Sequence, residues 1–367
     1  MSRQSRILVL MTDAYGGHGG ISRFNRDFLA ALSEWSGIEE AVVFPRLVTQ
    51  EIKEAIPPNI RFVDKGVTGK FSYIVNVLRH MLTDRRFDLL ICGHINLIPM
   101  AWLLSRWIGC PLLLIIHGID AWEPTRNRLA NRLCRSVDGV VAVSKLTLDR
   151  FCGWSKVNPE KGFILPNTVD LSAFTPGPKN PQLLARYGLT GKTVILTLGR
   201  IPSSERYKGY DEIIELMPSL LKEIPNLTYL IAGDGNDRSR LEEKARALGV
   251  TEQVIFAGMI AEEEKVDHYR LADAYVMPSR GEGFGIVLLE AMSCGLPVMA
   301  SKLDGGREAL RDGLLGILVD PREPQEILTG IKATLSRPKH IPEGVDYFSH
   351  ANFRKRVHDL VSSLTTK

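Results

Sequence analysis

The sequence contains no D-x-D motif and no other pair of carboxylates spaced to hold magnesium against a diphosphate. Its five cysteines form no C-x-x-C pair, and its most glycine-rich loop does not match the dinucleotide pattern G-x-G-x-x-G. These absences argue against magnesium-dependent diphosphate chemistry, a zinc site, a disulfide framework and nicotinamide binding. We therefore expect no metal ion and no cofactor, and buried thiols in a reducing cytoplasm.

Long apolar runs are also missing. The best candidate for a membrane span, residues 95–118, is interrupted by Arg106 and broken by Gly109 and Pro111, which predicts a helix followed by a strand. The apolar run Ile7–Met11 is too short for the core of a signal peptide and leads into a glycine loop, which predicts a first β-strand.

Charge is distributed unevenly between the two halves of the 367-residue chain. Residues 1–170 contain 21 Lys and Arg against 16 Asp and Glu, a net +5, whereas the remainder contains 25 against 26, a net −1. A basic first half is typical of a protein that meets an anionic acceptor or an anionic membrane surface. A mildly basic solvated face is an equally good interpretation.

Short runs of Val, Ile and Leu alternate with helical patterns along the whole chain. Continuous apolar strands of this kind are buried on both faces, so they predict parallel sheets covered by helices and a doubly wound α/β architecture. The expected strands are 6–12, 40–47, 61–64, 89–93, 112–117, 139–144 and 163–166 in the first half, and 194–199, 228–232, 254–257, 274–278, 298–300 and 316–319 in the second.

The length favours two domains. Residues 171–182 contain three prolines and a glycine among polar residues, which is typical of a linker. We therefore expect domains at 1–170 and 171–345, followed by a C-terminal helix within 346–367.

The strongest chemical signal is the run Gly281-Glu282-Gly283-Phe284-Gly285, which follows a predicted strand and is expected to open a helix. Glycines allow close approach of the backbone to a ligand, and the free N–H groups at a helix start suit a diphosphate. Glu290 lies eight residues after Glu282. A fully helical stretch of that length would span roughly 12 Å, about the distance from a donor sugar to its ribose.

Two further segments of the second half carry candidate phosphate ligands. Gly199 and Arg200 end one predicted strand and are followed by Lys208, and two cations at that edge of a sheet can neutralise a diphosphate leaving group. Gly233 and Asp234 follow the next strand in a second glycine turn. Each of these is a common surface feature when it occurs alone.

The first half offers two matching segments. The loop containing Gly16, Gly17 and His18 joins the first strand to a helix, a position where backbone N–H groups can cradle a phosphate. His117 and Asp120 follow the strand at 112–117, where a ring nitrogen could hydrogen-bond a sugar or orient an acceptor. A single histidine at such a place is more often structural.

Taken with these motifs, the chain resembles the retaining glycosyltransferases of family 4, which have the GT-B fold of two Rossmann-like domains facing a central cleft. The resemblance is carried by GEGFGIVLLEAMSCGLPVMAS, which is similar to that family's E-x7-E motif, and by LDGGREALRDGLLGILVD, which is similar to the segment after it. It implies a nucleotide-sugar donor with an α-linked sugar, an α-linked product, and a last helix that returns to the first domain.

The resemblance also implies roles for individual residues. Glu282 contacts the donor sugar, Arg200 and Lys208 the diphosphate, Glu290 the ribose, and His117 the region of the transferred sugar. We expect four catalytic residues: Glu282, His117, Arg200 and Lys208. The expected donor-binding residues are Gly16, Gly17, Gly199, Arg200, Lys208, Gly233, Asp234, Gly283, Phe284, Gly285, Ile286 and Glu290, and those expected to bind the acceptor are Asp120 and His18. The insertion at 203–207 leaves open whether Lys208 or Arg206 meets the phosphate.

The acceptor is less well defined. A predicted helix at 73–86 combines an apolar side with Arg79, Arg85 and Arg86, so it suits either an anionic membrane or an ordinary place on the first sheet. In the membrane interpretation the acceptor is a lipid-linked glycan of polysaccharide or lipopolysaccharide synthesis, and the protein is cytoplasmic and peripheral at the inner face. We expect no nucleic-acid partner, and the sequence gives no sign of the oligomeric state.

Three alternatives to a transferase remain. A nucleotide-sugar epimerase of the same fold would release nucleotide diphosphate without a second sugar. A nicotinamide dehydrogenase would need the dinucleotide motif that the sequence lacks. A catalytically inactive sugar-nucleotide binding protein would not need Glu282, Glu290, Arg200 and Lys208 together.

Overall fold

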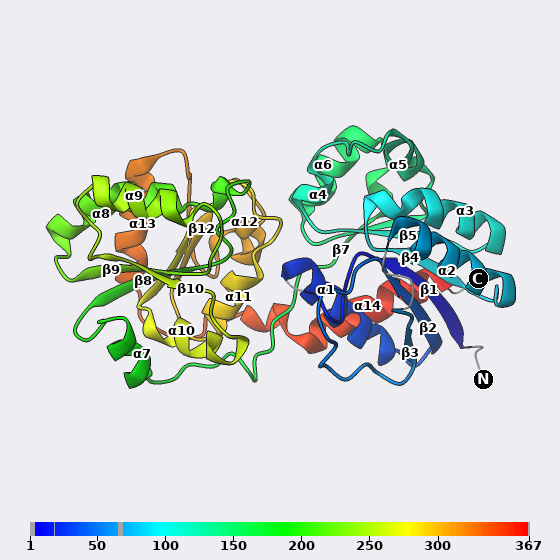
Figure 1. The fold of residues 1–367 in the computed structure, drawn as a ribbon, viewed down its shortest axis with the longest axis horizontal. Helices are drawn as coiled ribbons and strands as arrows, with labels where there is room; N and C mark the ends of the chain where they lie inside the picture. The colour runs from blue at the N-terminus through cyan, green and yellow to red at the C-terminus, as the bar shows by residue number, and fades with distance from the viewer. Residues whose placement is uncertain (1–3, 18, 65–68, 366–367) are drawn as a thin grey trace. The chain divides into compact units, whose positions relative to one another are not determined.

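The computed structural model describes residues 4–17, 19–64 and 69–365. The chain divides into two compact units (Figure 1), each built around its own parallel sheet. The first unit runs to Thr168 and takes up the chain again from His350, and the second is Val169–Ser349. These boundaries lie at 168/169 and 349/350, beside the boundaries at 170/171 and 345/346 expected from composition.

The first unit contains a seven-stranded parallel sheet in the order β3-β2-β1-β4-β5-β6-β7. The chain moves outward from β1 in one direction through β2 and β3, then in the other through β4, which is the doubly wound arrangement predicted from the sequence. The strands are β1 (Ser5–Met11), β2 (Ile38–Pro45), β3 (Ile60–Phe62), β4 (Leu89–Cys92), β5 (Leu112–Ile116), β6 (Gly139–Ala142) and β7 (Gly162–Ile164).

Helices cover both faces of this sheet. Side chains from α2, α3, α5 and α6 pack into one hydrophobic cluster with one face of the strands, whereas α1 and α14 lie together on the other (Figure 1). The helices are α1 (Gly20–Ser33), α2 (Lys70–Thr83), α3 (Ile98–Ile108), α4 (Ile119–Trp122), α5 (Arg128–Leu133), α6 (Lys145–Ser155) and α14 (His350–Thr365), with short 3-10 turns η1 (Ile95–Leu97), η2 (Cys134–Ser136) and η3 (Pro159–Lys161).

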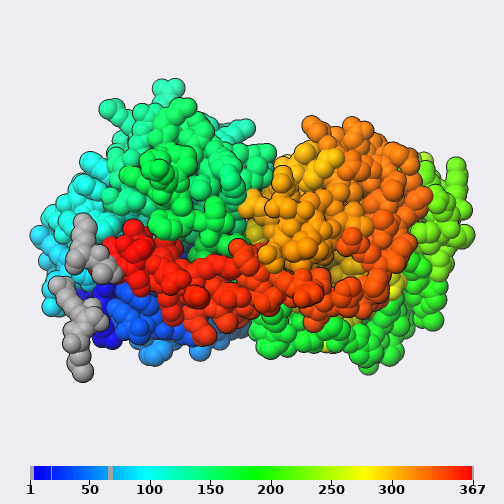
Figure 2. Space-filling view, turned by 180° about the vertical axis from the view of Figure 1, so that it is seen from behind, coloured from blue at the N-terminus to red at the C-terminus, as the bar shows by residue number. Residues whose placement is uncertain are grey.

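The last helix, α14, completes the first unit. Its buried Phe353 meets the ring of Phe24 in α1 edge-on at 5.8 Å between centroids, and His358 Nε2 lies 2.8 Å from the Ala31 carbonyl oxygen. Figure 2 shows α14, in red, lying against the blue N-terminal part of that unit. The helix spans His350–Thr365, within the range 346–367 expected from the sequence.

The second unit contains a six-stranded parallel sheet in the order β10-β9-β8-β11-β12-β13. Its strands are β8 (Thr193–Leu198), β9 (Leu227–Ala232), β10 (Val254–Gly258), β11 (Ala274–Met277), β12 (Val298–Ser301) and β13 (Ile317–Val319). The helices are α7 (Pro181–Arg186), α8 (Tyr210–Glu223), α9 (Arg238–Ala247), α10 (Lys265–Leu271), α11 (Ile286–Ser293), α12 (Gly306–Ala309) and α13 (Pro324–Leu335), with turns η4 (Arg206–Lys208), η5 (Glu262–Glu264), η6 (Arg311–Gly313) and η7 (Val345–Phe348).

The segment that resembled a membrane span is divided as predicted. Helix α3 ends at Gly109, whose φ of 80° is left-handed, and β5 begins at Leu112. Within the described ranges, no helix combines the length and apolarity needed to cross a bilayer. The five cysteines are buried and unpaired, as expected, and burial raises the pKa of Cys92, Cys110, Cys134 and Cys294 to about 12.

Candidate active site

The candidate site of the second unit lies at the carboxyl edge of its sheet. Because all its strands are parallel, the segments that follow β8, β9, β11 and β12 emerge at one edge, where open α/β sheets bind ligands. The strand order places β8 beside β11 at the point where the winding direction reverses. The sequence-predicted donor residues Gly199, Arg200, Gly233, Asp234, Gly283, Phe284, Gly285 and Ile286 follow β8, β9 and β11 at that edge.

Lys208 and Glu282 form the central pair of this edge. Lys208 Nζ lies 3.4 Å from Glu282 Oε2, and both side chains are mostly buried. Lys208 ends the turn η4 directly before α8, whereas Glu282 belongs to the loop between β11 and α11. A cation and a carboxylate are therefore held side by side where a charged, hydroxyl-bearing ligand would lie.

Arg200 is the most exposed member of the group. Its side chain is 75% exposed, and Nη2 donates to Glu205 Oε1 at 2.8 Å. Glu205 Oε2 also lies 3.9 Å from Lys208 Nζ. Glu205, which belongs to the insertion and was not predicted as a site residue, thus places a carboxylate near both cations.

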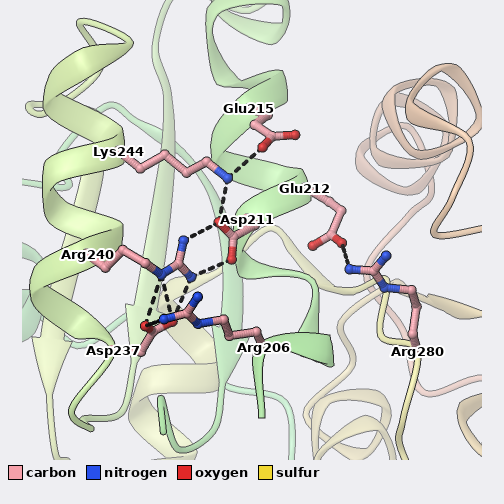
Figure 3. A network of polar contacts seen from close by, with 8 residues as sticks. All are labelled: Arg206, Asp211, Glu212, Glu215, Asp237, Arg240, Lys244 and Arg280. Atoms are coloured by element: carbon pink, nitrogen blue, oxygen red, sulfur yellow. Dashed lines mark hydrogen bonds and ion pairs between the residues drawn. The ribbon is translucent and has the colours of Figure 1, made fainter. Parts of the chain in front are cut away.

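Arg206 and Lys208 contact different partners. Arg206 Nη2 donates to Asp237 Oδ1 at 2.9 Å, and that carboxylate also accepts from Arg240, which in turn binds Asp211 (Figure 3). This network fastens η4 to α8 and α9. The network engages Arg206, whereas Lys208, directly after the insertion, is the cation that pairs with Glu282.

An ion pair and a backbone hydrogen bond of Arg280 hold the loop before Glu282. Arg280 Nη2 lies 2.6 Å from Glu212 Oε1 of α8 (Figure 3), and the Arg280 backbone N–H donates to the Tyr207 carbonyl at 2.7 Å. Burial raises the pKa of Glu212, and Arg280 opposes this shift. The segments that carry Lys208 and Glu282 are therefore joined to each other as well as to α8.

Asp304, after β12, organises the same loop and was not predicted. Its Oδ2 accepts from Ser279 Oγ at 2.6 Å and from the Glu282 backbone N–H at 2.9 Å, and its Oδ1 accepts from the Gly306 N–H at 3.0 Å. Burial raises the pKa of Asp304 to about 7 despite these bonds. The sequence offered only a weak signal, the segment LDGG within the family-like run.

The backbone of Glu282 is supported further by Gly305. The Gly305 N–H donates to the Glu282 carbonyl at 2.8 Å, and a Cβ at Gly305 would lie 2.0 Å from the Gly283 carbonyl oxygen. After this loop, α11 starts at Ile286, with Gly285 at its N-cap in a left-handed conformation. The stretch between the two glutamates is consequently helical only in its second part, and the first N–H groups of α11 have no intrahelical partner.

Glu290 occupies a different environment from Glu282. It is 1% exposed, and its two oxygens accept from Lys265 Nζ and the Tyr269 hydroxyl, each at 2.7 Å. Both partners come from α10 and were not foreseen, because nothing in a single helix shows which neighbour it faces. Glu290 is thus a rigidly held carboxylate at the inner side of α11.

The loops after β8 and β9 are joined through their backbones. The Ile201 N–H donates to the Asp234 carbonyl at 2.9 Å, and Gly233, with φ of 144°, approaches Gly199 so closely that a Cβ would lie 1.9 Å from its carbonyl oxygen. The Asp234 side chain is 3.7 Å from Arg238 in the first turn of α9. Gly199, Gly233 and Asp234 therefore shape the edge with their main chains.

The first unit has its own polar group at the carboxyl ends of β4 and β5. His117 contacts the Phe24 ring edge-on at 5.1 Å, and neither of its shielded ring nitrogens makes a protein hydrogen bond of good geometry. Burial lowers the pKa of His117, and Asp120 and the Gly93 carbonyl oppose that shift. Asp120 Oδ2 is likewise buried without a partner, so this group has free capacity to bind polar atoms.

His94 belongs to the same group and was missed by the sequence analysis. It follows β4 as His117 follows β5, and its Nδ1 accepts the Asn96 N–H at 3.0 Å, which leaves the proton of the neutral ring on Nε2. Burial lowers the pKa of His94 too. The signal that could have found it is its position directly after a buried strand, next to that of His117.

The predicted glycine loop of the first unit lies after β1. The Gly16 carbonyl accepts from the N–H groups of Thr49 and Gln50, and a Cβ at Gly17 would lie 2.5 Å from Asp13 Oδ2. His18, expected near the acceptor, lies outside the described residues. Among the residues that are described, no group of three or more His, Cys, Asp or Glu side chains is arranged to hold a metal ion.

Two doubly wound parallel sheets, each with glycine turns or polar side chains at its carboxyl edge, have the topology of the GT-B fold. Comparison with known families agrees. Residues 18–173 match the family described as Glycosyltransferase Family 4, and residues 182–344 match Glycosyl transferases group 1. The chain belongs to glycosyltransferase family 4.

Similar proteins of known name are glycosyltransferases. The chain is 34% identical over 256 residues to a GDP-mannose-dependent alpha-(1-6)-phosphatidylinositol monomannoside mannosyltransferase of Mycolicibacterium smegmatis, covering 66% of each chain. It is 30% identical over 294 residues to a D-inositol 3-phosphate glycosyltransferase of Corynebacterium urealyticum, covering 73% of this chain and 69% of that one. For a second such enzyme, from Geodermatophilus obscurus, the match spans only 48% of the relative's length.

Solved structures share the fold over the full length. HepE of Anabaena in complex with UDP-glucose superimposes with a TM-score of 0.78 at 21% identity, covering 98% of this chain and 100% of that one. The lipopolysaccharide outer core galactosyltransferase WaaB gives 0.75 at 19% identity, covering 98% and 99%.

Proposed function

We propose that the protein is a retaining hexosyltransferase that moves a sugar from a UDP- or GDP-sugar to a glycan or lipid-linked glycan, forming an α-glycosidic bond without a metal ion. The observation that carries this proposal is the Lys208–Glu282 pair, 3.4 Å apart at the carboxyl edge of the second sheet and beside the start of α11. A phosphate suits the cation and the helix N–H groups, and a sugar hydroxyl suits the carboxylate.

In the proposed reaction, the bond between the anomeric carbon and the diphosphate oxygen breaks as the acceptor oxygen attacks from the same face. Arg200 and Lys208 balance the negative charge that develops on the diphosphate, together with the N–H groups of Phe284, Gly285 and Ile286. The departing phosphate oxygen takes the proton of the acceptor hydroxyl. Glu282 orients the sugar, and Glu290 accepts from the ribose hydroxyls by exchanging one of its present partners.

The first unit is proposed to supply His117 beside the transferred sugar, with Gly16 and Gly17 near the donor phosphates and Asp120 and His18 near the acceptor. The ring nitrogens of His117 and one Asp120 oxygen support this part of the proposal, since these shielded polar atoms make no protein hydrogen bond of good geometry.

The names of two similar proteins support a nucleotide-sugar donor and a lipid-linked acceptor. One is GDP-mannose-dependent and acts on a phosphatidylinositol mannoside, whereas another was solved with UDP-glucose. We propose a lipid-linked acceptor for this chain and a cytoplasmic location at the inner face of the membrane. The basic first half of the sequence agrees with an anionic surface.

A donor screen followed by two conservative substitutions tests the proposal. UDP-, GDP- and dTDP-sugars are ranked by thermal shift, and release of nucleoside diphosphate from the best donor is then measured with chelator present. Lys208→Met and Glu282→Gln should each lower turnover about 100-fold or more, because each removes a contact to developing charge or to the sugar. Lys222→Met and Glu252→Gln, which change exposed residues of the same types, are the matched controls.

Three outcomes would count against the proposal. Near-normal turnover in both site variants would remove the Lys208–Glu282 pair from the mechanism, and loss of turnover with chelator would show a metal requirement. If NMR showed that the first hexose released has the opposite anomeric configuration to the donor, a retaining mechanism would be excluded. Conversion of the donor to a stereoisomeric sugar would instead favour the epimerase alternative.

A further inference from the structure

Large apolar side chains are exposed on only one of the two helical layers of the first unit. Helices α2, α3 and α5 expose six of them: Phe71, Val75, Leu82, Leu103, Trp107 and Leu129. In the layer on the opposite face of the same sheet, α1 and α14, whose residues are all described, expose none. Because the two helical layers of one sheet differ, the exposure of large apolar side chains is specific to α2, α3 and α5 and is not a general property of the surface.

Helix α2 has two apolar stripes. Tyr73, Val77 and Met81 are buried against the sheet. Phe71, Val75 and Leu82, with the half-buried Leu78 between them, recur at intervals of three and four residues and form a second stripe that points away from the core. Phe71 is 84% exposed and Leu82 is 66% exposed. A helix that only covered a sheet would have polar residues at these positions.

The outward stripe continues onto the neighbouring helices. The Arg85 guanidinium, just after α2, stacks over the Trp107 ring of α3 at 4.2 Å. Helix α3 contacts α5, and both contribute to the same core cluster. Leu103 and Trp107 on α3 and Leu129 on α5 therefore extend the exposed apolar surface across the layer.

The charged side chains of these three helices have one sign. Helices α2, α3 and α5 contain Lys70, Arg79, Arg106, Arg128 and Arg132 and no Asp or Glu. Two acids that follow these helices in the chain are in ion pairs: Asp84, after α2, binds Arg6, and Asp138, after α5, lies 3.6 Å from Arg106. We call the exposed side chains of α2, α3 and α5, with Arg85, Arg86 and Arg135, the basic apolar face.

We propose that the basic apolar face docks on an anionic lipid bilayer. Exposed apolar residues ringed by Lys and Arg match an interface in which rings and alkyl groups enter the headgroup region and the cations meet lipid phosphates. Lipid fits this face better than a second copy does, because two such faces would bring like charges together. It also fits better than a purely polar polyanion, which would leave Phe71, Leu82 and Trp107 without apolar contacts.

This inference rests on the proposed function in one respect, since docking brings the protein to a lipid-linked acceptor. It adds a surface on α2, α3 and α5 that is separate from the residues assigned to the reaction. A variant of this face should consequently lose membrane binding while it keeps its reaction with a donor in solution.

Co-sedimentation with vesicles tests the inference. The protein is mixed with phosphatidylcholine vesicles with and without phosphatidylglycerol, at low and high salt. We expect binding only to the anionic vesicles, weakened by salt. Arg79→Glu/Arg128→Glu should lower the affinity about tenfold or more, because each substitution replaces a cation that attracts anionic lipid by a carboxylate that is repelled from it. Phe71→Ser/Leu82→Ser should also lower it, at every salt concentration.

Lys192→Glu/Lys355→Glu is the matched control, because it makes the same change in net charge at exposed residues outside the face. It should bind vesicles as the wild type does. Thermal unfolding and donor hydrolysis in solution, measured on all variants, should match those of the wild type. Hydrolysis that fails in the wild type would contradict the proposed function, whereas intact hydrolysis with no vesicle binding would contradict only this inference.

Other results would also overturn the inference. Equal loss of binding in the control would mean that net charge, and not this face, attracts the protein to vesicles. A wild-type dimer that Phe71→Ser/Leu82→Ser dissociates, without vesicle binding, would assign the face to a second copy of the chain.

Discussion

Asp304 is the residue on which the geometry of the Glu282 loop most depends. Its carboxylate accepts three hydrogen bonds, one of them from the Glu282 backbone N–H. The Asp304 residue is almost entirely buried. Burial alone would favour the neutral carboxylic acid, whereas the three hydrogen-bond donors favour the charged carboxylate. The balance raises its pKa to about 7, so its protonation changes near neutral pH.

Replacing Asp304 by Asn should therefore change how stability depends on pH. The folded protein keeps the Asp304 proton up to about pH 7, whereas the unfolded chain loses it near its usual pKa. Between those values the folded state binds more protons, so wild-type stability should fall with rising pH, by roughly 4 kcal/mol at most from this group. Urea unfolding across this range should show a shallower fall in Asp304→Asn.

The same variant should lower kcat/KM about tenfold, because the amide cannot accept all three hydrogen bonds and the Glu282 loop loosens. Asp312→Asn, at an exposed aspartate, is the control for both measurements. Unchanged pH dependence in Asp304→Asn would show that this carboxyl titrates at its ordinary pKa.

The site residues also show how far a single residue's role can be predicted. The sequence predicted Lys208 as a phosphate ligand and left Arg206 open as an alternative. The assignment to Lys208 depends on Asp237, 31 residues further along, which engages Arg206. Lys265 and Tyr269 were missed because their contacts with Glu290 join two helices and leave no local pattern. Glu205 was missed although its partners Arg200 and Lys208 are close in sequence.

At the scale of elements, the loops of the second unit are held by close backbone approaches. Gly305 lies against Gly283 and donates to the Glu282 carbonyl. Its φ of −64° is open to any residue, so only the missing side chain matters here. The sequence run LDGG predicted membership of the family but did not show that this glycine supports the Glu282 loop.

Gly305→Ala should consequently destabilise the protein by about 1–3 kcal/mol, because its Cβ would meet the Gly283 carbonyl and push the loop away. Turnover should fall with it. Gly153→Ala is the matched control, since no atom lies within 4 Å of its added Cβ and its place inside α6 should make alanine neutral or stabilising. If the two variants had the same free energy of unfolding in urea, the Glu282 loop would accommodate the added Cβ without loss of stability.

At the scale of the whole molecule, the chain leaves the first unit at Thr168 and returns to it at His350. Helix α14 is separated from α1 by more than 300 residues of sequence, yet the two share a core of Phe24, Phe28 and Phe353. The stability of the first unit therefore depends on the last helix of the chain.

Phe353→Ala should lower the stability of the first unit by about 3–5 kcal/mol, because it removes a buried ring from that core. Calorimetry should show a lower first-unit transition and an unchanged second-unit transition, and hydrogen exchange should increase in α1. Lys355→Ala, on the exposed side of α14, should leave both unchanged. A shift confined to the second unit would contradict the assignment of α14.

The sequence by itself determined the α/β class, the thirteen strands within a few residues, and the family, because buried strands and glycine turns are local patterns. It also placed the candidate residues at strand ends. Only the tertiary structure decided that Lys208 pairs with Glu282, that Asp304 holds the loop, and that one stripe of α2 faces outward. These depend on packing between distant segments, which fixes the direction of a side chain that its own neighbours in sequence leave open.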